Sequence, residues 1–326
     1  MGFRVATFNL KDFVAPSAKE RERFTEKVRW TAELVASLSA DVVAFQEVGD
    51  REWLDLLLNH ERIDGRYAHV VMGSADARGI RSVIVSSLPT FDSRVHTADA
   101  LPIPTLGQLA APEFAAPIPL RRGVVEVEVR PEGFGSVRVI TGHFKSRRPV
   151  LFESTRKERK RAAGRLGDAH LRSVFWRAAE ASFVRERVDK ILDEQGVHVV
   201  VLGDFNDTRD SVPLRLLRGK EPTALVDVTE RLAAGRRYTS MHDGRREQID
   251  HLLVSASLDG LCTNAGIENH HVRQHPHVPN DAEIARGASR PRLEHDSDHA
   301  PIWAEFACAD PLLRSGVVPQ GKSSDS

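Results

Sequence analysis

Residues 197–207 read VHVVVLGDFND, and this stretch guides the interpretation of the whole chain. Its valine and leucine run predicts a buried strand over 197–204, with Asp204 at the carboxyl end. Asn206 follows two positions later. A strand end is a rigid mount at the rim of a sheet, so both side chains are candidate catalytic groups.

Five other segments also place polar side chains where an apolar run ends or begins. They are Asn9 after RVATF, Glu47 after DVVAF, His143 after VRVIT, Asp250 and His251 near the start of QIDHLLVS (248–255), and Asp298 with His299 before APIWAEF (300–306). Taken singly, such a residue is more typical of a turn or a helix cap. Because six segments share the arrangement, we expect one polar site; His251 alone is interpreted as a strand residue that faces the rim.

The residue types indicate which cofactor this site would bind. Carboxylate and carboxamide oxygens without a cysteine partner are typical of Mg²⁺ or Mn²⁺ sites rather than of structural zinc. The chain has two cysteines, Cys262 and Cys308, too few for a disulfide framework or a cysteine-rich zinc site. We therefore expect Mg²⁺ or Mn²⁺ as the cofactor.

Composition excludes several classes of protein. The 326 residues include 46 Lys plus Arg and 46 Asp plus Glu, so a globally basic nucleic-acid coat is excluded and any anion-binding surface must be local. No apolar run approaches the roughly 20 residues of a membrane-spanning helix. The N-terminal stretch MGFRVATFNLKDF has no signal-peptide pattern, so a cytoplasmic location is expected.

Periodicity along the chain predicts a mixture of helices and strands without strict alternation, which favours an α+β fold over a purely parallel sheet. VVEVEV (124–129) and SVRVIT (136–141) predict a hairpin with one solvent-facing side. The proline-rich stretch 98–119 is expected to be a loop. We expect one domain over 1–308 and a flexible tail over 309–326.

The remaining predicted elements are helices at 18–39, 50–59 and 171–194, and strands at 3–8, 41–48, 69–72, 82–87, 197–204, 248–255 and 300–306.

A basic block covers residues 145–177, which contain eleven Lys or Arg and three Asp or Glu. Its position after the His143 motif favours binding of a nucleic-acid backbone, with Lys145, Arg147 and Arg148 as the candidate substrate contacts. The alternative is a solvated helical face, which is what charge runs usually form.

A histidine-rich loop precedes the last strand, at 268–296. Its histidines are His270, His271, His275, His277 and His295. A second metal site or a substrate loop is one interpretation. A solvated polar loop is favoured, because histidine ligands need fixed neighbours that such a loop rarely supplies.

Six short motifs, taken in order, resemble those of the endonuclease/exonuclease/phosphatase superfamily, to which pancreatic-type deoxyribonuclease, apurinic endonucleases and sphingomyelinases belong. They are NL (9–10), QE (46–47), GHFKS (142–146), LGDFND (202–207), IDHLLVS (249–255) and SDHAP (297–301). The resemblance implies a four-layered α/β/β/α sandwich of two mainly antiparallel sheets flanked by helices. It also implies metal-dependent hydrolysis of phosphodiesters or phosphomonoesters.

The resemblance also implies roles for individual residues. Glu47 would be the principal metal ligand with Asn9 beside it, and Asp298 would complete the metal cluster. Asp204 and Asn206 would orient the attacking water and contact the phosphate. His143 would hydrogen-bond a phosphate oxygen or help the leaving group, and His299 would be the base-like histidine, held by Asp250.

These observations lead to a nuclease as the expected function, acting on DNA or RNA by attack of an activated water. One alternative is a phosphatase or phosphodiesterase of the same fold that acts on a small phosphoester or a lipid headgroup. Another is a non-catalytic binding protein on this fold. Nucleic acid is the expected substrate partner; no membrane segment and no protein partner are expected.

Overall fold

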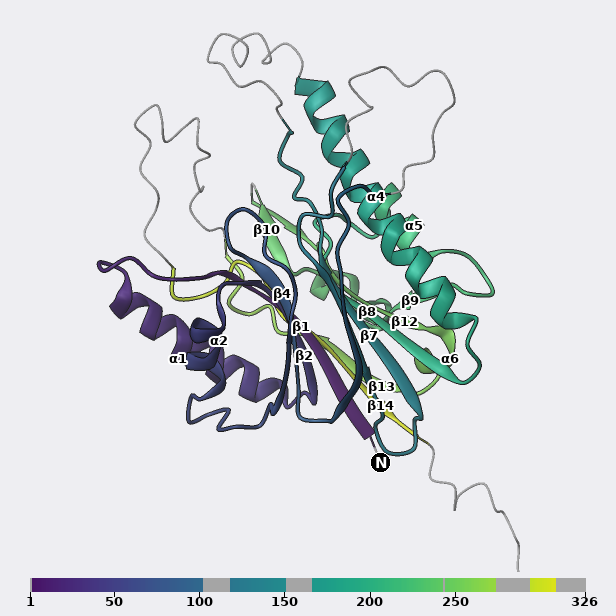
Figure 1. Cartoon of the computed structure of the whole chain (residues 1–326), viewed down its shortest axis with the longest axis horizontal. Coiled ribbons are helices and arrows are strands. Elements are labelled where there is room, and N and C mark those ends of the chain that lie inside the picture. Colours follow the sequence, from purple (N-terminus) through teal and green to yellow (C-terminus); the bar gives the residue numbers. More distant parts are fainter. Residues whose placement is uncertain (1, 102–117, 151–165, 243, 274–293, 309–326) are drawn as a thin grey trace, which may run out of the picture.

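Two six-stranded sheets pack face to face, and helices cover the outer face of each (Figure 1). The computed structural model describes residues 2–101, 118–150, 166–242, 244–273 and 294–308. The predicted four-layered sandwich is confirmed. Most of the expected proline-rich loop and the expected tail at 309–326 lie outside the described residues.

The first sheet has the strand order β13-β14-β1-β2-β4-β3. Only β1 and β2 are parallel neighbours, and helix α1 (Arg21–Leu38) connects them. Helices α1 and α2 (Arg51–Leu58) cover the outer face. The strands are β13 (Cys262–Ile267), β14 (Ile302–Ala307), β1 (Gly2–Phe13), β2 (Val42–Val48), β4 (Arg81–Ser86) and β3 (His69–Met72).

The second sheet has the order β5-β6-β7-β8-β12-β9. Its one parallel pair is β7 with β8, connected by the long helix α4 (Leu166–Leu192). Helices α4 and α5 (Val212–Arg218) cover its outer face. The strands are β5 (Thr90–His96), β6 (Val124–Val129), β7 (Ser136–His143), β8 (Val197–Asp204), β12 (Asp250–Ser255) and β9 (Leu225–Asp227).

Smaller elements lie between β9 and β13. Strands β10 (Ser240–His242) and β11 (Arg245–Glu247) form a separate two-stranded sheet. Two short 3-10 helices, η4 (Val228–Arg231) and η5 (Ala234–Arg236), precede this sheet, and the one-turn helix α6 (Ala256–Asp259) follows β12.

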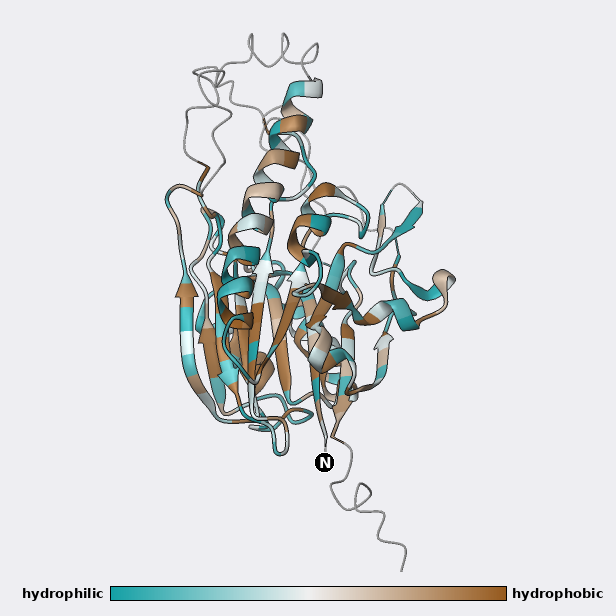
Figure 2. Ribbon diagram, turned by 90° about the vertical axis from the view of Figure 1, so that its right-hand side faces the viewer, coloured by the Kyte–Doolittle hydropathy of each residue, from teal (hydrophilic) through white to brown (hydrophobic). Residues whose placement is uncertain are grey.

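Apolar side chains form three cores, one between the sheets and one beneath each helical layer. Val139 and Val200 face the first sheet, whereas Phe8 and Phe45 pack beneath α1 and α2. The interior strands are therefore hydrophobic on both faces (Figure 2). Full burial of one such phenylalanine stabilises the fold by about 1.5–3 kcal/mol.

The predicted hairpin at 124–141 forms, but its expected solvent-facing side is wrong. Every residue of β6 is buried. Glu126 is fully covered because Arg187 of α4 donates two hydrogen bonds to its carboxylate, at 2.7 and 2.8 Å. The alternating glutamates of VVEVEV therefore include an ion-paired side chain beneath helix α4, and they do not indicate a solvent-exposed face.

All the other predicted helices and strands are present, with ends that shift by up to five residues. The sequence did not predict β5, β9, α5, β13 or the β10–β11 pair. These elements are short, or are exposed and polar as in β5, so periodicity gives little signal.

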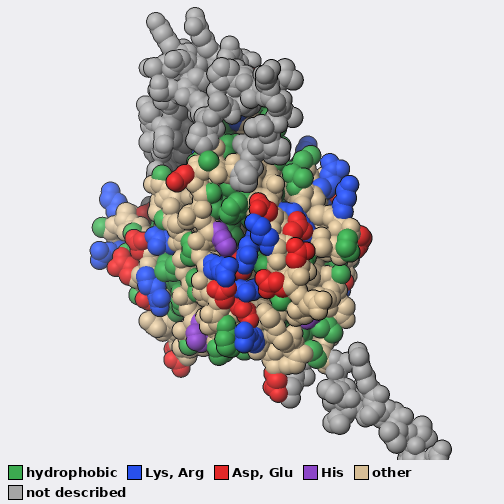
Figure 3. Space-filling view, turned by 45° about the vertical axis from the view of Figure 1, so that its right-hand side comes forward, with side chains coloured by type: hydrophobic (Ala, Val, Ile, Leu, Met, Phe, Trp, Pro, Cys, Tyr) green, Lys and Arg blue, Asp and Glu red, His purple; other side chains and the backbone are tan. Residues whose placement is uncertain are grey.

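Surface charge agrees with the neutral composition. Lysine, arginine, aspartate and glutamate side chains are interspersed on the face shown in Figure 3. Within the described ranges, none of the helices is long and apolar enough to span a membrane.

Candidate active site

Strand register in the second sheet brings three predicted site residues side by side. His143 pairs with Asp204 across the parallel β7–β8 ladder, and Asp250 pairs with Asp204 on the other side, from antiparallel β12. Two glycines permit this close approach. Gly203 has φ +144°, and a Cβ there would lie 2.1 Å from the carbonyl oxygen of Gly142. Only glycine fits at Gly203 without displacing a neighbouring strand.

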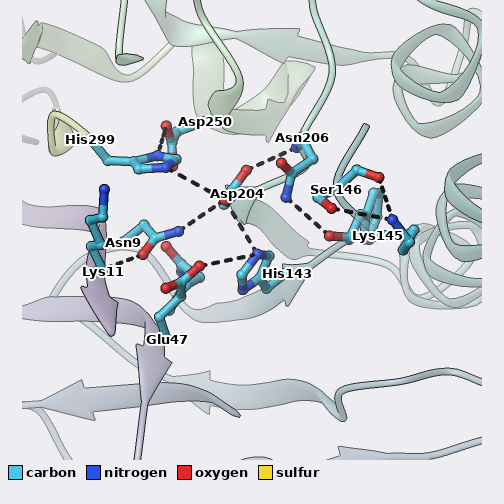
Figure 4. Close-up of polar contacts among 12 residues, drawn as sticks. Asn9, Lys11, Glu47, His143, Lys145, Ser146, Asp204, Asn206, Asp250 and His299 are labelled. Carbon is cyan, nitrogen blue, oxygen red and sulfur yellow. Dashed lines mark hydrogen bonds and ion pairs between the residues drawn. The ribbon is translucent and has the colours of Figure 1, made fainter. Parts of the chain in front are cut away.

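The first sheet supplies Asn9 and Glu47 at the carboxyl ends of its own parallel pair. Asn9 Nδ2 donates to Asp204 Oδ2 at 2.9 Å, a bond that joins the two sheets (Figure 4). Glu47 Oε2 accepts from the backbone N–H of Asp12 at 2.9 Å. Glu47, Asp12 and Lys11 all have positive φ, between 48° and 60°. Such strained backbone costs of order 1 kcal/mol or more per residue and is typical of functional sites.

A second layer of hydrogen bonds holds the sheets in register beneath the site. The amide of Gln46 is fully buried, and its Nε2 donates to Thr7 Oγ1 at 3.0 Å and to Thr141 Oγ1 at 3.2 Å. Thr7 belongs to the first sheet and Thr141 to the second. The glutamine of the QE motif therefore connects the sheets, while the glutamate faces the site.

Asp250 and His299 form a buried carboxylate–imidazole pair. Asp250 Oδ2 lies 2.8 Å from His299 Nδ1, and His299 Nε2 lies 4.0 Å from Asp204 Oδ2. Burial alone would lower the pKa of His299, but the charges of Asp250 and Asp204 outweigh it and raise that pKa to about 10. Without a bound metal, the imidazole is therefore charged at neutral pH.

Negative charge is concentrated around Asp204. Burial and the charge of Asp250 raise the pKa of Asp204 to about 7. Burial and the charge of Glu47 raise the pKa of Asp12 to about 6. The Nε2 atom of His143 lies 3.4 Å from Asp204 Oδ2. His143 nevertheless supplies little positive charge to offset that of the carboxylate, because burial holds its pKa well below the usual 6.5.

This arrangement fits a divalent cation. The charge of Lys11 balances that of Asp298, and the charge of His299 balances that of Asp250. Glu47 and Asp204 instead lie beside His143, whose lowered pKa keeps it neutral. A cation held by Glu47 and Asp204 would offset the negative charge that, together with burial, raises the pKa values of Asp204 and Asp12. The available donors are carboxylate and carboxamide oxygens, which suit Mg²⁺ or Mn²⁺.

A second possible donor set is Asp204, Asp250 and His299, whose ligand atoms lie within 4.8 Å of one another. Asp250 and His299 are already bound to each other. Asn9 lies next to this set through its hydrogen bond to Asp204, and Glu47 lies 4.0 Å from His143. The roles of Asn9, Glu47 and Asp298 as metal ligands stay predictions.

The comparisons with known proteins agree with this geometry. Residues 6–299 match the sequence model described as Endonuclease/Exonuclease/phosphatase family. The chain belongs to the endonuclease/exonuclease/phosphatase family. Enzymes of this family hydrolyse phosphoesters and depend on divalent metals. Among curated proteins, none has significant sequence similarity to this chain.

Solved structures of the endonuclease/exonuclease/phosphatase family share the fold. Truncated TDP2 from Caenorhabditis elegans superposes with a TM-score of 0.58 and 17% identity, covering 94% of this chain and 98% of that one. A family protein from Bacteroides vulgatus superposes with a TM-score of 0.57 and 18% identity, covering 95% of this chain and 100% of that one. The 3′ phosphatase NExo from Neisseria, bound to a product DNA hairpin, superposes with a TM-score of 0.53 and 20% identity, covering 94% of this chain and 100% of that one. At these identities the likeness shows the fold alone.

Eight of the site residues predicted from the family motifs lie together in the structure. Asn206 joins the group through its backbone N–H, which donates to Asp204 Oδ1 at 2.9 Å, and its Nδ2 donates to the carbonyl of Phe144 at 3.1 Å. The eight are Asn9, Glu47, His143, Asp204, Asn206, Asp250, Asp298 and His299. Their individual roles stay predictions.

Lys11 is a site residue that the sequence did not reveal. Its ammonium lies 2.5 Å from Asp298 Oδ2. The backbone N–H of Lys11 donates to Asn9 Oδ1 at 2.9 Å, so the residues after the NL motif also orient the side chain of Asn9. The only sign of it in the sequence is the charged KD pair (11–12) directly after NL.

The three predicted substrate contacts form no hydrogen bond or ion pair with these eight residues. Lys145 Nζ donates to the carbonyls of Ser146 and Arg148 at 2.8 and 2.9 Å, and burial together with nearby arginines lowers its pKa to about 7. Arg147 forms an ion pair with Glu247, and Arg148 is exposed. Residues 151–165 of the basic block lie outside the described residues. Contact of these side chains with substrate stays a prediction.

Two further histidines, His251 of the IDHLLVS motif and His271 of the long loop, are hydrogen-bonded within the protein. His251 is fully buried rather than facing the rim, with Nδ1 3.0 Å from Asp227 Oδ2 and Nε2 2.9 Å from the carbonyl of Asp207. His271 Nε2 lies 2.9 Å from the carbonyl of His299 and so supports the site from behind. His275 and His277 lie outside the described residues.

The end of the long loop contains another acidic group, Glu294, His295 and Asp296. Arg273 binds both carboxylates, with Nη2 3.0 Å from each. The described part of the loop therefore carries an ion-paired cluster rather than an open metal site.

Proposed function

We propose that this protein is a Mg²⁺- or Mn²⁺-dependent phosphodiesterase, most specifically a nuclease that cleaves DNA or RNA by direct attack of water. The observation that carries the proposal is the convergence of the Asp250–His299 pair on Asp204, directly opposite Asn9 and Glu47. A cytoplasmic location is part of the proposal and is supported by Cys262 and Cys308, both free thiols.

Each residue has a role that follows from its contacts. Asp204 is held by Asn9 and by the backbone of Asn206, so its carboxylate is fixed where it can orient water. His299, positioned by Asp250, can stabilise negative charge on the phosphate or exchange a proton with it. His143 lies beside Asp204 and can hydrogen-bond a phosphate oxygen. A bound divalent ion would neutralise charge on the phosphate oxygens and lower the pKa of water.

One observation favours the second candidate, a phosphoesterase for small substrates. Lys145 and Arg147, the expected contacts for a polymer backbone, are occupied by partners within the protein. Among the described residues, a nuclease would therefore have to use other cations than these two, whereas an enzyme for small phosphoesters would need none. Arg148 is exposed, and residues 151–165 of the basic block lie outside the described residues.

The test is cleavage of supercoiled plasmid, of an RNA oligonucleotide and of bis(p-nitrophenyl) phosphate, each with Mg²⁺, Mn²⁺ or EDTA. The Asp204→Asn variant removes the central carboxylate. Asp193→Asn is the matched control, because Asp193 is exposed just beyond α4. We expect metal-dependent cleavage that falls by roughly 10²–10⁴-fold in Asp204→Asn and persists in the control.

Each alternative result has a defined meaning. Cleavage of the small diester without plasmid or RNA cleavage would favour the small-substrate phosphoesterase. Cleavage that survives EDTA or the Asp204→Asn change would contradict the proposed site. An inactive but folded wild-type protein would contradict the proposal itself.

A further inference from the structure

A cationic segment outside the family motifs lies beside the site. Residues 236–246 read RRYTSMHDGRR, with four arginines and one acid, and include the hairpin β10–β11. We refer to residues 236–246 as the arginine arm; residue 243 lies outside the described residues. In Figure 2 the hairpin projects from the body of the molecule as a largely hydrophilic element.

The base of the arginine arm is hydrogen-bonded to both members of the carboxylate–imidazole pair. Thr239 Oγ1 accepts from the backbone N–H of Asp250 at 3.1 Å. Ser240 forms an antiparallel bridge with His299, and the next residue, Ala300, donates its N–H to the carbonyl of Thr239 at 2.7 Å. The arm therefore begins in the wall of the site and has a fixed position relative to it.

A cavity of about 310 Å³ separates the arginine arm from the loop that follows Asn206. Its polar lining comprises Thr208, Arg209, Arg237, Arg246, Glu247 and Gln248. Glu247 is neutralised by its ion pair with Arg147, and Arg209 is ion-paired with Glu230. Arg237 and Arg246 therefore supply the excess of positive charge in this cavity. Such a cavity is suited to an anion.

The arginines are held in place before any ligand binds. Arg237 donates from Nε to the carbonyl of Leu232 at 2.7 Å and from Nη2 to the carbonyl of Glu230. Arg246 is exposed, with its guanidinium 4.7 Å from the ring centroid of Tyr238. Fixed guanidinium groups lose less entropy on binding and match phosphate oxygens in bidentate geometry.

The cavity lies close to the site along the chain. Thr208 is two residues after Asn206, and Gln248 is two residues before Asp250. Two residues of extended chain span at most about 7 Å. A substrate with a single phosphate at Asp204 would leave the cavity unused, whereas a polymer carries further phosphates on both sides of the one that is cleaved.

We propose that the arginine arm and this cavity bind a flanking phosphate of a nucleic-acid strand while the neighbouring phosphodiester lies at Asp204. The inference rests on the proposed function and specifies its substrate as a polymer with a phosphodiester backbone. It also supplies the cationic surface that Lys145 and Arg147 do not provide.

The experiment compares Arg246→Met and the double variant Arg245→Met/Arg246→Met with wild type. Methionine keeps an unbranched stem over Tyr238 but removes the charge. Arg215→Met is the matched control, because Arg215 is exposed on α5 away from the cavity. Two quantities are measured: binding of a fluorescent twelve-nucleotide single strand in EDTA over a salt series, and kcat/KM for that strand and for bis(p-nitrophenyl) phosphate with Mg²⁺.

We expect Arg246→Met to weaken binding of the strand roughly tenfold and to reduce the salt slope by about one. The loss of kcat/KM should be at least several times larger for the strand than for the small diester, and Arg246→Lys should restore much of it. The control should match wild type on both substrates.

Equal losses on the two substrates, or an unchanged salt slope, would overturn the role of the arginine arm. Variants that bind and cleave the strand as wild type does would overturn it as well, and would leave the proposed function intact. A wild-type protein that hydrolyses neither substrate would instead contradict the proposed function, so the two failures are distinguishable.

Discussion

Lys11 and Asp298 form an ion pair at the partly exposed edge of the site, with Nζ 2.5 Å from Oδ2. The two residues are 287 positions apart in the sequence and come from the first strand and from the segment before the last one. The pair places a fixed positive charge of the protein beside carboxylates that are expected to bind a metal.

Removing this charge should strengthen metal binding. In Lys11→Met, the repulsion between the ammonium and a divalent ion disappears. We expect the affinity for Mn²⁺ to rise roughly tenfold, measured by isothermal titration calorimetry. Lys190→Met, which removes an exposed lysine paired with Glu186, is the control and should not change it. Weaker binding in Lys11→Met would show that Lys11 supports the ion instead of opposing it.

Asp250 should determine the charge of His299. In the Asp250→Asn variant without metal, the largest favourable interaction of the imidazolium is lost. We expect the pKa of His299 to fall from about 10 by more than one unit, measured by NMR titration in EDTA, and activity with metal to fall by roughly 10²–10⁴-fold. An unchanged titration would mean that Asp250 does not set the protonation of His299.

Gly203 should be indispensable for folding. A methyl group there would meet the carbonyl oxygen of Gly142 at 2.1 Å, so β7 and β8 would have to separate. We expect Gly203→Ala to destabilise the protein by on the order of 4 kcal/mol or more in urea unfolding. Gly235→Ala is the control, because a Cβ there meets no atom within 4 Å. Similar unfolding curves for both variants would refute this steric account.

Glu126 should contribute to stability in a pH-dependent way. Burial alone would raise the pKa of Glu126, but hydrogen bonds from Arg187 and His96 outweigh burial and lower it to about 2. Without these partners, as in the unfolded chain, the pKa is 4.5. The contribution of about 3 kcal/mol is therefore complete above pH 4.5 and is lost as the pH falls from about 4.5 through 2.

Urea unfolding of wild type and Glu126→Gln over this pH range checks the expectation. The difference in free energy of unfolding between them should shrink steadily towards pH 2. Glu186→Gln, which changes an exposed glutamate, should show no such trend. A constant difference for Glu126→Gln would mean that its carboxylate gains nothing from folding.

The fold and most of the site were accessible from sequence because strand ends carry a local signal. Asn9, Glu47, His143 and Asp204 each follow an apolar run, and the two parallel strand pairs gather these ends at one edge. Local patterns did not show which cations would face the site. Lys145 is adjacent to the His143 motif, yet backbone carbonyls bind its ammonium on the inner side of the loop.

Other features depended on partners far away in the chain. The ion pair of Lys11 forms with a residue near the other end of the sequence. The arginine arm has a mixed composition that indicates only a turn, and its significance comes from the hydrogen bonds of Thr239 and Ser240 to the site. No periodicity could have predicted these contacts, because they arise only when β12 and β14 are in place.

The Asn9–Asp204 hydrogen bond has a consequence for how such an enzyme is produced. It unites a residue from each sheet, and His299 enters just before the final strand, so neither sheet alone holds a functional set of groups. A chain emerging from the ribosome would thus be inert until His299 had been made and both sheets had docked. The nuclease proposed above would in this way stay inactive during its synthesis, without any separate inhibitor.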